Sequence, residues 1–401
     1  MAAASALIDI PAHIPPGRTY DFDISHDPLL TPDLHLGLLE LRQRAPEIFF
    51  TPRYGGHWIA QGHEAVFEIT HDAELFSSWQ GLRQMIPIGI DPPQHESYRR
   101  VLLQAFSPRT VTAMTATIRA RSAELIDAVA RRGRCEFVRE VSEPMPVTVF
   151  MKMLGLPLEM MAPLRSLIIT ALEEGDPVKR EATFDAQLEM LDPIIHARMA
   201  NPQDDMLSRI ATADLDGRRP TFDEMQRYLL LLANAGLDTV VNAMSFAVRH
   251  LAIDQALQDR VRADPSLVPD LLEEFLRRYA VSSIGRRVTR DTVFRGVSLQ
   301  AGERFILLLP AANLDETVYD DPGAVQLNRD APPVTFGTGP HRCLGSHLAR
   351  LELRILLTDW MTRIPSFSLD PSSPPKTHAG LVYTVDQLDL VWDGSRAVGP
   401  G

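Results

Sequence analysis

Cysteine is scarce in this sequence: Cys135 and Cys343 are the only two among 401 residues. Two thiols cannot form a disulfide framework, and they cannot supply a four-thiolate zinc or iron–sulfur site within one chain. If either cysteine takes part in chemistry, we expect it to act as a single sulfur atom.

Positive charge is also in short supply. The chain has 40 Lys and Arg against 52 Asp and Glu, which gives a formal net charge of −12. Bulk binding to nucleic acid depends on neutralising phosphates, so this balance argues against such a function. It remains compatible with a local basic patch that meets an acidic partner.

Uninterrupted apolar runs of membrane-spanning length are missing. The longest apolar stretch, residues 228–251, is interrupted by Asn234, Asp238, Thr239, Asn242, Arg249 and His250. A bilayer span rarely tolerates so many polar groups, so the stretch predicts a buried core helix. The first sixteen residues lack a basic region, and Asp9 interrupts their apolar run. We therefore expect no secretory signal, no membrane anchor and a cytoplasmic protein.

The chain shows no low-complexity linker, composition shift or internal repeat that would divide it, which predicts one domain over residues 1–401. Helical spacing of apolar residues dominates and predicts a mostly α fold with small β-sheets. The predicted helices cover residues 110–132, 144–173, 184–200, 222–251, 267–280 and 344–363. The predicted strands cover residues 47–50, 57–60, 287–288 and 305–309.

The predicted helix over residues 222–251 has a clear start, because Thr221 and Glu224 fit a capping box. About thirty helical residues span roughly 45 Å, so this helix should cross the centre of the molecule. Gly236 lies in its interior, where glycine costs ~1 kcal/mol relative to alanine. The polar residues at its midpoint are costly to bury. A packing or functional reason is expected for both.

The strongest local pattern is FGTGPHRCLG at residues 336–345. Its glycines permit tight turns and close approach of a flat ligand. Cys343 stands just before a predicted helix, whose positive end would favour a thiolate over a thiol. A lone cysteine is usually a small apolar core residue. The glycines, Phe336 and the neighbouring basic residues favour a ligand instead.

This pattern resembles the Phe-x-x-Gly-x-x-x-Cys-x-Gly haem-binding loop of the cytochrome P-450 family, through Phe336, Gly339, Cys343 and Gly345. The likeness extends over residues 28–392 and is closest to the camphor-hydroxylating subgroup in residues 236–242. It implies a single-domain cytochrome P-450 fold, with haem b between the long central helix and the helix after Cys343. It also implies that Cys343 is the axial ligand of the haem iron.

The resemblance implies roles for the polar centre of the long helix. Asp238 would help to deliver protons, and Thr239 would order a hydrogen-bond network to iron-bound oxygen. The alternative for Thr239 is a bond back to the carbonyl of Ala235. A kink near Gly236 could admit dioxygen and water.

The resemblance also assigns the remaining contacts of the cofactor. The expected set, propionate contacts included, is His95, Arg99, Arg286, Phe336, Gly337, His341 and Gly345. Glu274 and Arg277 share one helix face at i, i+3. A solvated surface pair is the simpler interpretation, whereas the resemblance implies a structural network with Arg329.

The expected substrate is a small apolar molecule, a terpenoid or norisoprenoid ketone. By the resemblance, its contacts would be Met85, Ile86, Ile88, Leu231, Asn234, Ala235, Leu381 and Val382. Arg83 aligns with the ketone-binding tyrosine of the camphor enzyme, so camphor itself is not expected. The Asn234 amide either binds a substrate oxygen or bonds within its own helix, and the sequence favours neither.

The electrons must come from outside, because the sequence shows no flavin or nucleotide module. The resemblance implies an acidic 2Fe-2S ferredoxin with an NAD(P)H-dependent reductase, and a monomeric enzyme. The expected docking residues are Arg99, Arg100, Arg342 and Arg350; a solvated set of arginines is the alternative. Rival functions are a peroxide-using enzyme of the same fold, a haem carrier without turnover and a helical interaction protein.

Overall fold

The computed structural model describes residues 7–31, 33–79, 84–173 and 177–397, and its chain is mostly helical, with small sheets. The helices of the first half are α1 (Leu34–Arg44), α2 (His63–His71), α3 (Gln94–Leu103), α4 (Pro108–Ala113), α5 (Thr115–Ala130), α6 (Pro144–Leu154), α7 (Met161–Glu173) and α8 (Pro177–Ala200). Those of the second half are α9 (Met206–Thr212), α10 (Phe222–Gly236), α11 (Thr239–Ile253), α12 (Gln255–Ala263), α13 (Val268–Arg278), α14 (Leu309–Ala312) and α15 (Ser346–Arg363).

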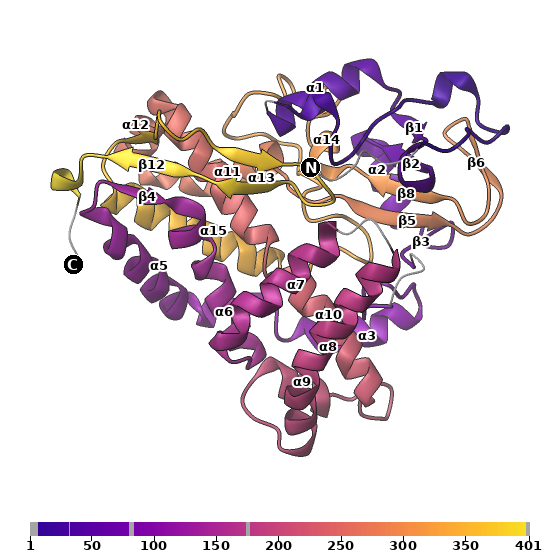
Figure 1. Cartoon of the computed structure of the whole chain (residues 1–401), viewed down its shortest axis with the longest axis horizontal. Coiled ribbons are helices and arrows are strands. Elements are labelled where there is room, and N and C mark those ends of the chain that lie inside the picture. The colour runs from indigo at the N-terminus through magenta and orange to yellow at the C-terminus, as the bar shows by residue number, and fades with distance from the viewer. Residues whose placement is uncertain (1–6, 32, 80–83, 174–176, 398–401) are drawn as a thin grey trace.

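The strands form a larger sheet and several small ones. They are β1 (Ile48–Thr51), β2 (His57–Ala60), β3 (Phe76–Ser77), β4 (Arg134–Glu136), β5 (Ile284–Val288), β6 (Thr292–Phe294), β7 (Val297–Leu299), β8 (Arg304–Leu307), β9 (Phe367–Leu369), β10 (Lys376–His378), β11 (Thr384–Gln387) and β12 (Asp389–Trp392). The five-stranded sheet has the order β1-β2-β8-β5-β3, with β2 and β8 parallel. Figure 1 shows this sheet with α1 and α2 at one end of the molecule, away from α8 and α9.

The long central helix is interrupted, so the prediction of one continuous helix over residues 222–251 was wrong. α10 begins at the predicted capping box, and α11 starts again at Thr239 and continues to Ile253. Between them, Asp238 has φ −130° and ψ −36°, outside helical values. A Cβ on Gly236 would lie 2.4 Å from the Phe150 ring, so glycine allows α6 to pack closely against this break.

Other predicted boundaries also changed. The predicted helix over residues 144–173 is divided, because Gly155 has φ 78° and caps α6 in the left-handed conformation. The predicted helix over residues 110–132 is divided into α4 and α5 at Met114. The strand predicted to reach Leu309 ends at Leu307, and Leu309 and Pro310 instead begin α14.

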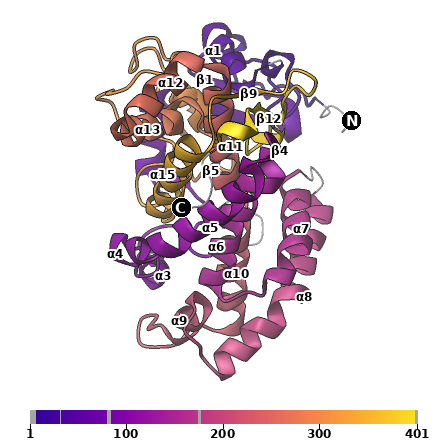
Figure 2. The same ribbon diagram turned by 90° about the vertical axis from the view of Figure 1, so that its left-hand side faces the viewer.

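α10 and α11 together are long and apolar enough to cross a membrane by length and composition alone. The most apolar window of residues 222–253 has a mean hydropathy of 1.4, and 61% of it is buried inside the protein. Figure 2 shows α11 surrounded by α12, α13 and α15, while α10 extends toward α8 and α9. This burial is that of a core helix.

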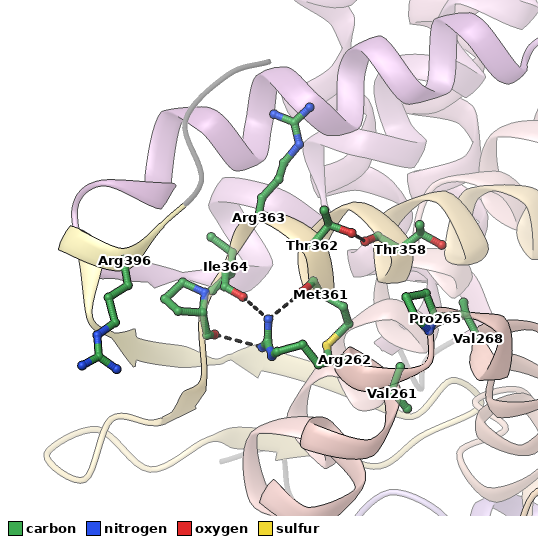
Figure 3. A pocket seen from close by; sticks show the side chains of 11 residues that line it. Val261, Arg262, Pro265, Val268, Thr358, Met361, Thr362, Arg363, Ile364 and Arg396 are labelled. Carbon is green, nitrogen blue, oxygen red and sulfur yellow. Dashed lines mark hydrogen bonds between the residues drawn. The ribbon is translucent and has the colours of Figure 1, made fainter.

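α15 carries the predicted cysteine loop at its start and is fixed at its other end by Arg262 of α12. The Arg262 guanidinium donates to the carbonyls of Met361 and Ile364, both at 2.6 Å, and to that of Pro365 at 3.1 Å (Figure 3). The four residues joined by these bonds line a hollow of about 360 Å³. The hollow lies at the C-terminal end of α15, from Thr358 onward, whereas Cys343 precedes the N-terminal end, so Arg262 holds the scaffold and lies outside the candidate site.

Candidate active site

The loop before α15 is shaped by two glycines. Gly337 and Gly339 have φ values of 66° and 68°, in the left-handed region that favours glycine. A Cβ on Gly339 would lie 2.3 Å from the carbonyl oxygen of Thr70, at the end of α2. The Cys343 N–H donates to the Phe336 carbonyl at 2.8 Å, which closes the loop. The sulfur of Cys343 is therefore positioned by backbone geometry.

The surroundings of the Cys343 sulfur suit a ligand of a cation. Burial has the largest effect and raises the pKa of this thiol. The N–H groups of Gly345 and Ser346, together with Arg99 and Arg342, lower the pKa by a smaller amount. The residue nevertheless remains exposed to solvent, so a ligand can reach it. A bound metal cation would complete the ionisation that the protein only begins.

A cluster of basic side chains lies beside this loop. The rings of His95, on α3, and His341 are 4.2 Å apart. The positive charges of Arg286, on β5, and of Arg99 also lower the pKa of His341. Among the described residues, both ring nitrogens of His95, Nε2 of His341 and Nη2 of Arg286 are buried without a hydrogen-bond partner. Groups of this kind are costly to bury unless an acceptor meets them.

The pKa values of this cluster show the same shortage of negative charge. Burial lowers the pKa of Arg286 to about 10, and Asp91 opposes it. Burial, together with Arg286 and His95, lowers the pKa of His341 to about 3. Burial and Arg99 lower the pKa of His95. Two carboxylates, such as those of haem b, would supply the missing acceptors and charge, so these residues fit that cofactor.

Arg99 connects α3 to the cysteine loop, because its Nη2 donates to the carbonyl oxygen of Arg342. Arg100 and Arg342 are exposed. Arg350 is already engaged: its guanidinium donates twice to Glu273, at 2.6 and 2.9 Å, and lies over the Phe336 ring at 4.6 Å. Of the four arginines proposed for partner docking, Arg100 and Arg342 are therefore exposed, whereas Arg350 is paired with a carboxylate.

The break between α10 and α11 holds a buried acid. One oxygen of Asp238 accepts from Arg165 of α7 at 2.9 Å, and the other accepts from Asn242 at 2.9 Å. Arg165 also forms an ion pair with Glu143 at 3.1 Å. The Thr239 hydroxyl donates to the carbonyl of Ala235 at 3.3 Å, which is the local bond considered from the sequence.

Asn234 bonds within its own helix and also beyond it. Its Nδ2 donates to the carbonyl of Leu230 at 2.8 Å and to Oε1 of Gln187, on α8, at 2.7 Å. On the same helix, Leu231 is half-buried and Ala235 is exposed. These two side chains are therefore accessible although α10 runs through the protein.

The other predicted substrate contacts fall into two groups. Met85 packs against an apolar cluster of α7, α8 and α10, and Ile86 is fully buried, whereas Ile88 is exposed. Leu381 and Val382 are joined by backbone contacts to residues 282 and 283, just before β5. Arg83 lies outside the described residues.

Glu274 and Arg277 form a buried ion pair, with oxygen–nitrogen distances of 2.7 and 2.8 Å. Glu274 also accepts from Arg329 at 3.0 Å. Arg277 donates further to the carbonyls of Asn313, Pro322 and Ala324. The alternative of a solvated surface pair is therefore wrong, because both side chains are almost completely buried.

Three polar residues around the break were not identified from the sequence: Glu143, Arg165 and Gln187. Gln187 did leave a signal, because it interrupts the apolar face formed by Phe184, Leu188 and Leu191. Glu143 and Arg165 left none, since the elements that carry them meet Asp238 only in the folded chain.

Comparison with known proteins gives consistent matches. Residues 266–384 match the family model described as Cytochrome P450. Probable cytochrome P450 127A1 of Sinorhizobium fredii is 31% identical, over 96% of this chain and 97% of its own length. A steroid C26-monooxygenase of Mycolicibacterium smegmatis is 34% identical, over 88% of this chain and 92% of its own. The crystal structure of CYP101J2 is 33% identical, covers 96% of this chain and 100% of its own, and superposes with a TM-score of 0.88.

Proposed function

Because the chain belongs to the cytochrome P450 family and is a haem b monooxygenase, we propose that it hydroxylates a small apolar substrate of terpenoid or norisoprenoid size. The observation that carries this proposal is the Cys343 sulfur, which accepts from two backbone N–H groups beside a basic cluster with unpartnered donors. Cys343 would hold the iron, and Arg286, His95, His341 and Arg99 would hold the propionates. When bound, a haem with thiolate ligation supplies the cleavage of dioxygen.

The side chains at the break would deliver protons for the reaction. Asp238 would hold a proton at its carboxylate and pass it toward the Thr239 hydroxyl, which lies on the next residue. Arg165 and Asn242 fix that carboxylate through bonds of 2.9 Å each. The Thr239 hydroxyl, whose present bond to the Ala235 carbonyl is 3.3 Å long, would then pass the proton on toward the haem.

The substrate class is supported by the residues that would contact it. Met85, Ile86, Ile88, Leu231, Ala235, Leu381 and Val382 offer an almost entirely apolar lining. Relatives carry names as different as steroid C26-monooxygenase and cyclomarin C epoxidase, so membership of the family leaves the substrate open. The apolar character of the expected contacts therefore carries this part of the proposal.

The remaining properties extend the proposal from the resemblance of the sequence to this family. We propose a monomeric, cytoplasmic protein in which residues 1–401 form one haem domain. An acidic 2Fe-2S ferredoxin, supplied with electrons by its NAD(P)H-dependent reductase, would dock on Arg99, Arg100, Arg342 and Arg350. The exposed Arg100 and Arg342 would contribute most, because Arg350 is paired with Glu273.

Two experiments test this function. The purified holoenzyme is reduced with dithionite and exposed to carbon monoxide; thiolate ligation gives the long-wavelength Soret band that is characteristic of the family. A short-wavelength band that Cys343→His leaves unchanged would contradict the assignment. For the partner, R342E should slow reduction by the ferredoxin and weaken its dependence on ionic strength. R209E, on the exposed α9 arginine, is the matched control and should change neither.

A further inference from the structure

A pair of side-chain amides connects α8 to α10. Asn234 Nδ2 donates to Gln187 Oε1 at 2.7 Å and to the Leu230 carbonyl at 2.8 Å. Because a carbonyl only accepts, the Leu230 bond fixes which atom of Asn234 is the nitrogen. That assignment in turn requires Gln187 to present its oxygen to Asn234.

Two of the four polar side-chain atoms of this pair have no hydrogen-bond partner among the described residues. Asn234 Oδ1 and Gln187 Nε2 are both buried, and neither has a hydrogen-bond partner among the described residues. Gln187 has no exposed surface at all. Burying a free acceptor and a free donor costs free energy, and a ligand that met both would recover it. The pair therefore offers one unpaired acceptor and one unpaired donor.

The pair lies beside an apolar cluster that adjoins a cleft. The cluster contains Ala171, Phe184, Leu188 and Leu230, with Met85 packed against it, and Leu230 is also a hydrogen-bond partner of Asn234. Leu188 and Leu230 line a cleft of about 640 Å³ between α8 and α10, whose other lining residues are polar or charged. A molecule that entered from this polar cleft would meet the apolar cluster at Leu188 and Leu230.

The pair lies close to the break in the central helix. Asn234 and Thr239 are five residues apart, on either side of the non-helical Asp238. An oxygen held at Asn234 would thus place a compact molecule near the residues of the break.

We propose that the Gln187–Asn234 pair is the polar anchor of the substrate and that it selects a hydroxyl group. A hydroxyl can donate to Asn234 Oδ1 and accept from Gln187 Nε2 at the same time. A ketone can use only the Gln187 donor, and a hydrocarbon uses neither. The inference rests on the proposed function and refines its substrate class to a compact apolar alcohol.

The test uses three probes with one skeleton: bornane, camphor and borneol, which carry hydrogen, a carbonyl and a hydroxyl at the same carbon. Their affinities for the holoenzyme are measured by the spin-state change in its absorbance. Asn234→Leu and Gln187→Met should each lower the affinity for borneol about tenfold, because one buried partner is left unpaired. Neither should weaken bornane, and camphor should respond to Gln187→Met more than to Asn234→Leu. The double variant should cost little more than either single one.

Gln226→Met is the matched control, because Gln226 also connects these two helices, through a 2.8 Å bond to Asp192 at the cleft. It should leave the ratio of borneol to bornane affinity unchanged. An unchanged ratio in both Asn234→Leu and Gln187→Met, a loss matched by Gln226→Met, or no binding of borneol would each overturn the proposal. The carbon monoxide spectrum separates these outcomes from a failure of the proposed function, since its long-wavelength band does not depend on the anchor.

Discussion

The two sides of the candidate site are built in different ways. The cysteine side, residues 336–345, is one short segment in which glycine φ values and backbone N–H groups position the sulfur. The other part, the break between α10 and α11, is assembled from side chains of α7 and α8 and from Glu143, just before α6. The first depends on local backbone geometry and the second on contacts between distant segments.

This difference predicts different responses to mutation. On the cysteine side, a single atom or a single Cβ should decide between function and failure, because no neighbouring side chain can compensate for backbone geometry. At the break, Arg165 is shared by Asp238 and Glu143, so one partner can partly replace another. Changes there should be graded and should depend on pH.

The largest effect is expected from Cys343→Ala. Removing the sulfur should abolish the long-wavelength carbon monoxide band and reduce product formation to background, because no second thiol can take its place. Cys135→Ala is the matched control, since Cys135 is the other cysteine and is buried in β4. The comparison breaks down if Cys343→Ala keeps the band or if Cys135→Ala loses it.

Gly339→Ala should come next. The left-handed φ of 68° costs about 1–3 kcal/mol for a residue with a side chain, and the new Cβ would also lie 2.3 Å from the Thr70 carbonyl. We expect a lower Tm and less haem bound per chain. Gly302→Ala has a φ of +89° with nothing within 4 Å of its Cβ, so it isolates the strain alone. Equal losses in the two variants would show that the close approach to α2 is unimportant.

Asp238→Asn should act on turnover while leaving the carbon monoxide band intact. Loss of a positioned acid typically costs about a hundredfold or more in rate, so the rate of product formation should fall by that order. Asp254→Asn, at the other end of α11, keeps a side chain that can cap α12 and should be neutral. A normal rate for Asp238→Asn with electrons from the ferredoxin would exclude Asp238 from proton delivery.

The smallest effect is expected at Glu143 and depends on pH. Burial, the largest effect, raises the pKa of Glu143 above its ordinary value of 4.5; Arg165 opposes this and Asp238 adds to it. The folded protein thus holds this proton to a higher pH than the unfolded chain does. Relative to Glu143→Gln, the wild type should lose stability as the pH rises from 4.5 through the raised pKa, with no further change above it.

The measurement is the Tm of both proteins at several values between pH 4 and pH 8. Glu124→Gln, which changes an exposed α5 carboxylate, should show no comparable trend. A constant Tm difference across the range would mean that Glu143 is ionised alike in the folded and unfolded chains. It would then be an ordinary partner of Arg165.

Local chemistry made much of this protein predictable from its sequence. The capping box of Thr221 and Glu224 begins α10 where it was expected, because both bonds lie within four residues. The cysteine loop could likewise be recognised from the sequence, since its glycines and its cysteine lie within one short segment. Apolar spacing located most of the helices, and it reports only which face of a helix is buried.

Only the tertiary structure decided the rest. The same spacing describes a continuous helix and one interrupted at Asp238, and only the folded chain places the Phe150 ring against Gly236 beside that interruption. Gln187 meets Asn234 across 47 positions of sequence, and Arg165 meets Asp238 across 73. Hydrogen bonds and ion pairs depend on distance in space, so the sequence determined the segment that would hold the iron, and the packing of α6, α7 and α8 determined the partners of Asn234 and Asp238.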